Sequence, residues 1–475
     1  MAQNVIISPE IIDEPGHDYT KVIGFTEAGY FVQLSNLSLE SSRDKVGFKH
    51  RRSRLTFYDK ELKKVWSKEL SSDRVNAHVT AVTFVNGKVL ILYSVQNTSE
   101  ESISIFYQWV DDAGDIEEGN EPLITFQLNR LQFDKPKIVL STSRKLLAVI
   151  LHEYRDKDSQ ALHVGVLSND LKLMSQKIFL IPFNEKQYLN SGFALSEMGD
   201  FAIIGFQSEK LKSSKKKVFY HMFISAANDT SIKEFKVAPE RNIKGIGISF
   251  DNFNNKIIIT GFHSDNRSTT GAAIFYSHYD FNSDSPPEIT SSPIDARQNV
   301  KLAGERNRNT GLALVNYPIE RIIVRNDGGA VIISEGSYTT EYSYYDYFTQ
   351  SYTRTIEYVF GNIVVISVNN DGSIDWSNVL EKFQVSVDDG GALSSFSHLL
   401  NSEEMITIFN TDISKKNKVV SAKINKYGEL SRPVILAKLE GLLLTPRSGR
   451  QVSASEIVIP VYNRKKLFLS RIIFD

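Results

Sequence analysis

The 475-residue chain contains no cysteine. This absence excludes disulfide bonds, thiolate metal sites, cysteine nucleophiles and lipid attachment at a cysteine. No apolar run approaches the roughly 20 residues that a membrane-spanning helix needs, so we expect no membrane span. Neither sign of charge dominates, because 55 lysines and arginines face 56 aspartates and glutamates. Bulk attraction to nucleic acid or to an anionic membrane is therefore not expected, and any charge preference must be local.

A recognisable signal peptide is also missing. Met1-Ala2-Gln3 stands directly before the first apolar run, without a basic n-region or an apolar h-region. Ala-Gln often follows a cleaved secretory signal, and the chain is rich in Asn, Ser, Thr and Tyr. These features favour an extracytoplasmic protein (periplasmic, cell-surface or secreted) with an added initiator Met, and a cytoplasmic protein is the alternative.

No segment has a convincing helical period, because Pro and Gly interrupt most candidates. Short β-branched and aromatic runs bounded by turn residues take the place of helices, and this pattern is typical of β-strands. Eight such runs mark the repeating unit: Tyr30 to Leu34, Val89 to Val95, Leu147 to His152, Phe201 to Phe206, Lys256 to Phe262, Ala330 to Ser334, Met405 to Asn410 and Ile457 to Tyr462.

One strand-turn-strand frame recurs along the chain: an apolar residue, Asn or Asp, two variable residues, Gly, a polar residue and an apolar residue. It occupies 110–116, 368–374 and 424–430, and a fourth copy places Trp66-Ser67 where the second copy places Trp376-Ser377. Asn or Asp followed by Gly between apolar runs forms a tight turn, since Gly adopts positive φ without steric cost. A unit that recurs through a long chain indicates stacked β-modules.

Four antiparallel strands per unit, arranged radially, predict one all-β domain over residues 1–475, an eight-bladed β-propeller. The last unit has only three strands, so we expect the N-terminal run Asn4 to Ile12 to pair with it and close the ring. Seven blades are the alternative if Ser291 to Gln384 folds irregularly. The blades are expected near residues 20–70, 78–128, 136–183, 190–238, 244–292, 320–384, 394–438, and 441–475 with 4–12.

At the hairpins that carry Gly372 and Trp376 the chain resembles the repeats of quinoprotein-like eight-bladed propellers, in which a turn Gly precedes a Trp by the same offset. The resemblance covers two or three blades and departs from the pattern where Leu62 replaces the Gly in the Trp66 copy. It implies the fold and no specific activity. The adjacent-cysteine disulfide typical of quinoprotein dehydrogenases is impossible here. Fold analogy also points to the extracytoplasmic scaffolds of outer-membrane protein assembly.

The long insertions fall in the connections between second and third strands (B–C) and between blades (D–A), which open on one face of a propeller. Long loops on a rigid scaffold commonly carry binding sites. The most distinctive segment, 338–354, is rich in Tyr, Ser and Thr, residues that make good recognition surfaces. The alternative is an extended hairpin packed on its neighbouring blade, with most tyrosines buried. The expected binding residues are Tyr342, Tyr344, Tyr345, Tyr347, Phe348, Tyr352 and Arg354.

Two basic loops accompany this segment and are expected at the rim of the same surface. They contribute Arg51, Arg52, Lys215 and Lys216. Clustered Lys and Arg bind phosphate or carboxylate groups, although such runs are commonly solvated loop tips. Nucleic-acid binding is not expected, because stacking on bases needs interleaved aromatic residues and these loops offer only Phe48.

Catalytic and metal-binding patterns are sparse. The histidines show no HxH or HExxH spacing, and Asp371-Gly372-Ser373 and Asp388 to Gly391 are predicted to be turns. His152-Glu153, and His263 with Asp265, stand at equivalent strand ends, where polar residues that end strands are the simpler interpretation. We expect no metal and no cofactor.

The sequence thus predicts a non-catalytic binding or scaffold propeller that engages a protein partner through its loop-rich face. The alternative is a glycan-binding propeller, or a glycoside hydrolase that uses the loop carboxylates Glu153, Asp265, Glu341 and Asp346. Enzymatic activity stays uncertain and is the less favoured prediction. A small ligand in the central channel is a further open alternative, since the inner strands show no decisive polarity pattern.

Overall fold

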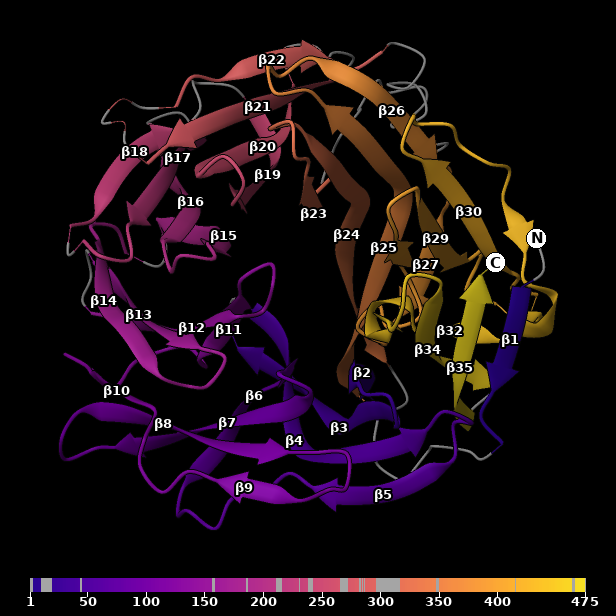
Figure 1. Ribbon diagram of the computed structural model, residues 1–475, viewed down its shortest axis with the longest axis horizontal. Coiled ribbons are helices and arrows are strands. Elements are labelled where there is room, and N and C mark those ends of the chain that lie inside the picture. Colours follow the sequence, from indigo (N-terminus) through magenta and orange to yellow (C-terminus); the bar gives the residue numbers. More distant parts are fainter. Residues whose placement is uncertain are drawn as a thin grey trace.

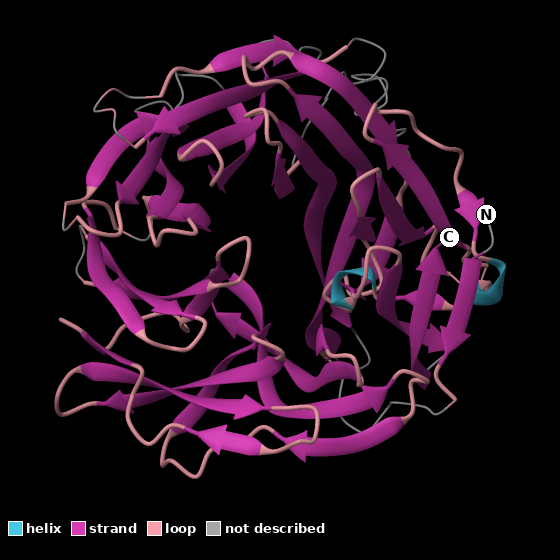
Figure 2. Cartoon of the chain, in the orientation of Figure 1, coloured by secondary structure: helices cyan, strands magenta, loops and turns pink. Residues whose placement is uncertain are grey.

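The computed structural model describes residues 3–9, 19–42, 45–155, 159–184, 187–210, 216–229, 231–237, 242–264, 272–281, 283, 285, 287–295, 317–346, 350–414, 416–463 and 466–474. Within these residues the chain forms eight antiparallel sheets arranged in a ring (Figure 1). The described part is otherwise loop and turn, with two short 3₁₀ turns, η1 (Ala437–Leu439) and η2 (Pro446–Ser448) (Figure 2). It contains no helix that is long and apolar enough to cross a membrane.

Each sheet is one blade of four strands, and three blades carry one additional short strand. Blades 1 and 2 comprise β2 (Tyr19–Phe25), β3 (Gly29–Ser42), β4 (Lys45–Asp59), β5 (Lys64–Glu69), and β6 (Ala77–Val85), β7 (Lys88–Asn97), β8 (Ser102–Val110), β9 (Ile116–Glu118), β10 (Ile124–Gln127). Blades 3 and 4 comprise β11 (Lys137–Leu140), β12 (Leu146–Tyr154), β13 (Gln160–Ser168), β14 (Leu173–Ile181), and β15 (Tyr188–Leu195), β16 (Phe201–Lys210), β17 (Lys216–Ser225), β18 (Lys233–Val237).

The remaining blades follow the same order. Blades 5 and 6 comprise β19 (Asn242–Asp251), β20 (Lys256–Ser264), β21 (Ala272–Asp280), β22 (Thr290–Pro293), and β23 (Ile319–Val324), β24 (Ala330–Asp346), β25 (Ser351–Val368), β26 (Ile374–Leu380), β27 (Gln384–Val387). Blades 7 and 8 comprise β28 (Phe396–Leu400), β29 (Glu404–Asn410), β30 (Val419–Asn425), β31 (Val434–Ile435), and β32 (Leu443–Leu444), β33 (Arg450–Gln451), β34 (Glu456–Asn463), β35 (Lys466–Phe474), with β1 (Gln3–Ile7).

The two ends of the chain meet in blade 8. Strand β1 pairs antiparallel with β35, with Val5 opposite Ile472 and Ile7 opposite Ser470. The N-terminal strand therefore supplies the missing outer strand of the last blade and covers the edge of β35. The predicted ring closure is confirmed, and Figure 1 shows β1 and β35 side by side.

Buried apolar side chains fill the contact between each pair of neighbouring blades, because each blade is apolar on both faces. In the described residues these side chains form eight clusters, one at each contact. Between blades 8 and 1, for example, Val458 and Leu469 pack with Val22 and Val32. Burying one such side chain stabilises the fold by about 1.5–3 kcal/mol. The chain is an eight-bladed β-propeller, as the repeat predicted.

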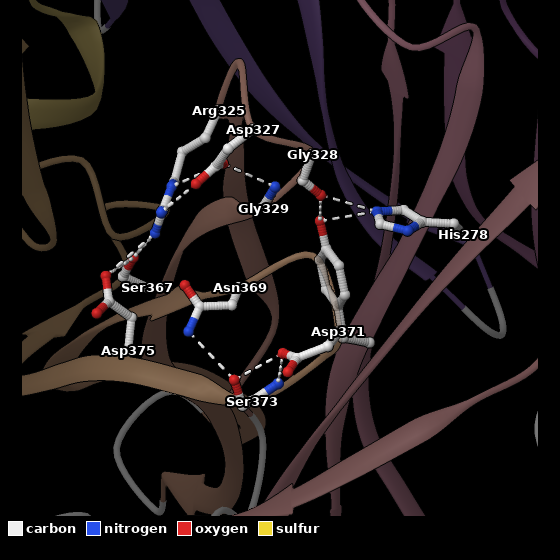
Figure 3. A network of polar contacts seen from close by, with 11 residues as sticks. His278, Arg325, Asp327, Gly328, Gly329, Ser367, Asn369, Asp371, Ser373 and Asp375 are labelled. Carbon is white, nitrogen blue, oxygen red and sulfur yellow. Dashed lines mark hydrogen bonds and ion pairs between the residues drawn. The ribbon is translucent and has the colours of Figure 1, made fainter.

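The short turns of blade 6 lie together at one end of the sheet (Figure 3). Asp371 accepts hydrogen bonds from the backbone N–H (2.9 Å) and the hydroxyl (2.6 Å) of Ser373, which is the geometry of an Asx turn. Arg325, just before the neighbouring turn, bonds to Asp327 and to Asp375, the latter at 3.2 Å. The predicted turn at Asp371 is confirmed. The polar side chains at both turns have partners within blade 6.

The B–C connections differ from the loops that the sequence predicted. In blade 1 and blade 6 they are extended hairpins, in which β3 stays paired with β4 out to Ser42 and Lys45, and β24 stays paired with β25 out to Asp346 and Ser351. In blade 6, threonine and tyrosine favour the extended backbone, so a segment that reads as a polar loop continues the strands. Seven blades were the alternative if Ser291 to Gln384 folded irregularly. Within that region residues 319–384 form a regular blade, while residues 296–316 lie outside the described residues.

Candidate functional site

Blade 6 carries a two-stranded ribbon that extends beyond its own sheet. Strand β23 pairs with β24 only as far as Ser334, whereas the pairing of β24 with β25 continues to Asp346. At about 3.4 Å per residue, the twelve positions from 335 to 346 (346 − 335 + 1) extend the ribbon by roughly 40 Å. We call residues 335–346 and 351–360 the blade 6 ribbon.

Side-chain contacts hold the two strands of the ribbon together. Tyr345 and Tyr352 face each other across the strands in an edge-to-face arrangement, with ring centroids 5.2 Å apart. The guanidinium of Arg354 binds the carboxylate of Glu341 at 2.5 Å. An exposed ion pair of this kind contributes less than about 1 kcal/mol, so the tyrosine pair and the backbone ladder carry most of the order.

The base of the ribbon is reinforced by β27. This strand pairs with residues 357–360 of β25. One residue further, the Asp388 carboxylate accepts a hydrogen bond from the Ile356 N–H at 2.8 Å, and Val359 beside it is buried. The ribbon is therefore anchored at its base, although it leaves the blade.

Five tyrosines of the ribbon are exposed to solvent, with exposed fractions between 41% and 76%: Tyr338, Tyr342, Tyr344, Tyr345 and Tyr352. These tyrosines are therefore not buried within the blade, as the alternative prediction required. Because side chains alternate along a strand, Tyr338, Tyr342 and Tyr344 share one face, and Tyr345 with Tyr352 the other. The ribbon therefore presents aromatic side chains on two accessible faces.

The outer edges of the ribbon are also available. In the part of the chain that the structure describes, no strand pairs with β24 beyond Ser334 on the side away from β25. Likewise none pairs with residues 351–355 of β25 on the side away from β24. A strand edge without a paired neighbouring strand can accept a further strand.

The structure places the other predicted binding residues as follows. Arg354 is exposed and bound to Glu341, as described above. Tyr347, Phe348 and Lys215 lie outside the described residues. The backbones of Arg51 and Arg52 belong to β4 and that of Lys216 to β17, while their side chains are not among those described. The exposed Tyr338 was missing from the prediction, although its alternation with Tyr342 and Tyr344 could have indicated it.

The carboxylates proposed for glycoside hydrolysis are not gathered in the described structure. Glu153 is fully buried in blade 3 and accepts hydrogen bonds from His163 (2.8 Å) and Arg155 (3.0 Å). Burial alone would raise the pKa of Glu153, but these bonds and two backbone N–H groups hold it below its usual value. Glu341 is exposed and ion-paired in blade 6. Asp265 and the side chain of Asp346 lie outside the described residues.

The histidine pairs have local partners. His152 bonds to Asp134 at 3.1 Å and to Gln160 at 2.5 Å, and the buried His263 lies 3.1 Å from the Ser291 hydroxyl. No group of three or more His, Asp or Glu side chains in the described residues has the geometry of a metal site.

A cavity of about 1090 Å³ lies at the centre of the ring. Its lining comes from the innermost strands of several blades and the turns beside them, including Phe84, Arg144, Arg321, His398 and Arg450. No pattern in the sequence indicates these lining residues, because they come from different blades and each stands in an ordinary context. Only closure of the ring brings them together.

No protein-family model matches the chain, and no curated protein matches it in sequence. Among solved structures it is similar to a lignostilbene dioxygenase from Pseudomonas brassicacearum (13% identity, TM-score 0.40, covering 88% of this chain and 89% of that one). It is also similar to the polysaccharide lyase Uly1 (9%, 0.37, 96% and 99%) and to the β-propeller domain of the Trilobed protease from Pyrococcus furiosus (8%, 0.35, 88% and 96%).

Proposed function

We propose that the protein is a non-catalytic scaffold that holds a partner protein with the blade 6 ribbon. The observation that carries this proposal is the exposure of five tyrosines on a ribbon whose base is fixed to a rigid ring. Tyrosine presents a large amphipathic surface with only two rotatable side-chain bonds, so little conformational entropy is lost on binding. Large exposed aromatic groups are also the residues that most often dominate binding energy at protein interfaces.

The arrangement of the ribbon favours a protein over a smaller partner. Its tyrosines point to both faces, and among the described strands none pairs with the outer edge of β24 beyond Ser334. A partner that contacts both faces and one edge gains aromatic burial and backbone hydrogen bonds together. A protein surface of ordinary interface size, about 800 Å² per partner, can cover such a ribbon.

Glycan binding is the second candidate, and one observation favours it. Tyr338, Tyr342 and Tyr344 form a row along one face of β24. Aromatic rings in a row can stack on successive sugar rings. A glycan would use this face alone, so loss of Tyr352 on the opposite face would leave its binding unchanged.

The test is a pull-down from an extract of the source organism, with mass spectrometry of the retained proteins. The bait is compared with Tyr342→Ser/Tyr352→Ser, which removes one tyrosine from each face. Tyr427→Ser is the matched control, because Tyr427 is 72% exposed in the turn after β30, away from the ribbon. We expect one stoichiometric protein that the control retains and the double variant loses. If no protein depends on the ribbon tyrosines, the scaffold proposal fails, and a glycan array is the next experiment.

A further inference from the structure

The central cavity is strongly cationic. Four arginines line it, from three different blades or the turns beside them: Arg144, Arg321, Arg447 and Arg450. The carboxylate in the described lining is Glu320. Glu320 is bound to Arg447 at 3.3 Å, so its charge is already balanced. Three guanidinium groups then remain without a counter-charge in the described residues.

These three arginines have neutral partners. Arg144 donates to the Phe84 carbonyl at 3.3 Å, Arg450 donates to a backbone carbonyl of β2, and Arg321 donates to the Nε2 atom of His398 at 2.6 Å. A ring nitrogen that accepts this bond carries no proton, so His398 is the neutral imidazole. Each guanidinium has five N–H donors, and within the described ranges each of these three uses one of them, so the others are left for a ligand.

The arginines affect one another. Burial, followed by the charge of Arg144, lowers the pKa of Arg321 and brings that of Arg450 to about 10. Arrangements of like charges without a counter-charge are unfavourable inside a protein, and they are typical of sites that bind the opposite charge. Arg144 also has a φ of +61°, in the left-handed region where a residue other than Gly is usually disfavoured.

The size and walls of the cavity define the ligand further. Its volume of about 1090 Å³ is at the upper end of small-molecule sites and far larger than an inorganic ion requires. Phenylalanine rings provide apolar wall beside the arginines, with Phe25 and Phe84 stacked at 6.3 Å and Arg450 lying 5.9 Å from the Phe84 ring. Guanidinium groups bind carboxylate and phosphate through paired N–H donors.

We propose that the central cavity binds a small organic anion with at least two carboxylate or phosphate groups, held by Arg144, Arg321 and Arg450. The anion supplies the missing counter-charge, and its organic part contacts the phenylalanine wall. This site is separate from the blade 6 ribbon and does not depend on the function proposed for it.

The proposal is tested by calorimetric titration of the full chain with citrate and with tripolyphosphate, against acetate at matched ionic strength and the neutral triethyl ester of citrate. We expect citrate or tripolyphosphate to bind, and acetate and the ester not to. The preferred anion identifies carboxylate or phosphate as the ligand group. Arg144→Gln and Arg450→Gln should each weaken binding about tenfold or more, since each removes charge-assisted hydrogen bonds. Arg432→Gln is the matched control and should leave the affinity unchanged, because Arg432 is exposed and does not line the cavity.

Glu320→Gln should change the affinity for the anion in the opposite direction. It removes the one carboxylate in the described lining and releases Arg447, so the anion should bind more tightly, an outcome that misfolding cannot produce. The proposal is overturned if neither polyvalent anion binds more tightly than acetate. It is equally overturned if the two arginine variants bind as the original chain does, or if Glu320→Gln weakens binding.

Discussion

The indole ring of Trp376 lies against Gly428, the turn glycine of the next blade. The same relationship joins blades 1 and 2, where a Cβ on Gly114 would lie 3.1 Å from the ring of Trp66. The Trp66 Nε1–H also donates to the Asp112 carbonyl at 2.8 Å. The glycine turn of one blade therefore docks on the tryptophan of the preceding blade, and the repeated sequence frame encodes contacts between blades as well as turns.

Gly428→Ala should lower the free energy of unfolding by about 1–3 kcal/mol. Gly428 has a φ of +81°, and a Cβ there would also collide with the Trp376 ring. Gly87→Ala is the matched control, because Gly87 has a φ of +76° but nothing near its Cβ position. Urea unfolding should therefore show a larger loss for Gly428→Ala. Equal losses would mean that the glycine–tryptophan contact contributes nothing.

Lys382→Met should lower the free energy of unfolding by about 3–5 kcal/mol. The Lys382 ammonium lies 2.6 Å from a Glu335 carboxylate oxygen, and both side chains are almost fully buried. Without the lysine, Glu335 would be a buried charge with no counter-charge. The control is Lys426→Met, which breaks the exposed pair with Glu403 and should cause no measurable change in a urea titration. A small effect of Lys382→Met would show that the buried pair is dispensable.

Stability should fall as the solution becomes acidic. Burial lowers the pKa of His163 despite the raising effect of Glu153, and burial with the Arg321 charge lowers that of His398 to about 4. An unfolded chain, with a histidine pKa near 6.5, binds protons that these folded histidines do not. The free energy of unfolding should therefore decrease as the pH falls from about 6.5 towards 4.

Glu153 extends this loss to lower pH. Its pKa is below the usual value, so its stabilising effect is present above the unfolded pKa and is lost as the pH falls through the folded one. Urea titrations between pH 7.5 and 4.5 measure the main slope, and His398→Gln should reduce it. A free energy that does not change over this range would contradict the assignment of His163 and His398 as neutral in the folded protein.

Val5→Asp should open the ring. Val5 is buried in the contact between blades 7 and 8 and lies opposite Ile472 of β35. A carboxylate there cannot be satisfied, so β1 should detach and expose the edge of β35. We expect a lower urea midpoint and self-association on size exclusion. Ile7→Asp, at the exposed end of the same strand, should have a much smaller effect, and equal effects would contradict closure by β1.

Much of the fold could be predicted because its signals are local. Turn glycines such as Gly114 and Gly372 have positive φ, as the frame requires, and β-branched runs form the buried second strands. The ribbon was harder to predict, because tyrosine and threonine suit a buried strand as well as an exposed one. The cavity could not be predicted, because Arg144, Arg321 and Arg450 are distant in sequence and meet only in the closed ring.

The central claim concerns the ribbon tyrosines, so the most direct measurement is the affinity of the purified partner for three forms of the protein. We predict that Tyr342→Ser/Tyr352→Ser weakens binding at least tenfold while changing the free energy of unfolding by no more than about 0.5 kcal/mol, since both side chains are exposed. Tyr427→Ser should bind within about twofold of the original protein. Equal affinity of all three forms would contradict the claim that the blade 6 ribbon is the binding surface.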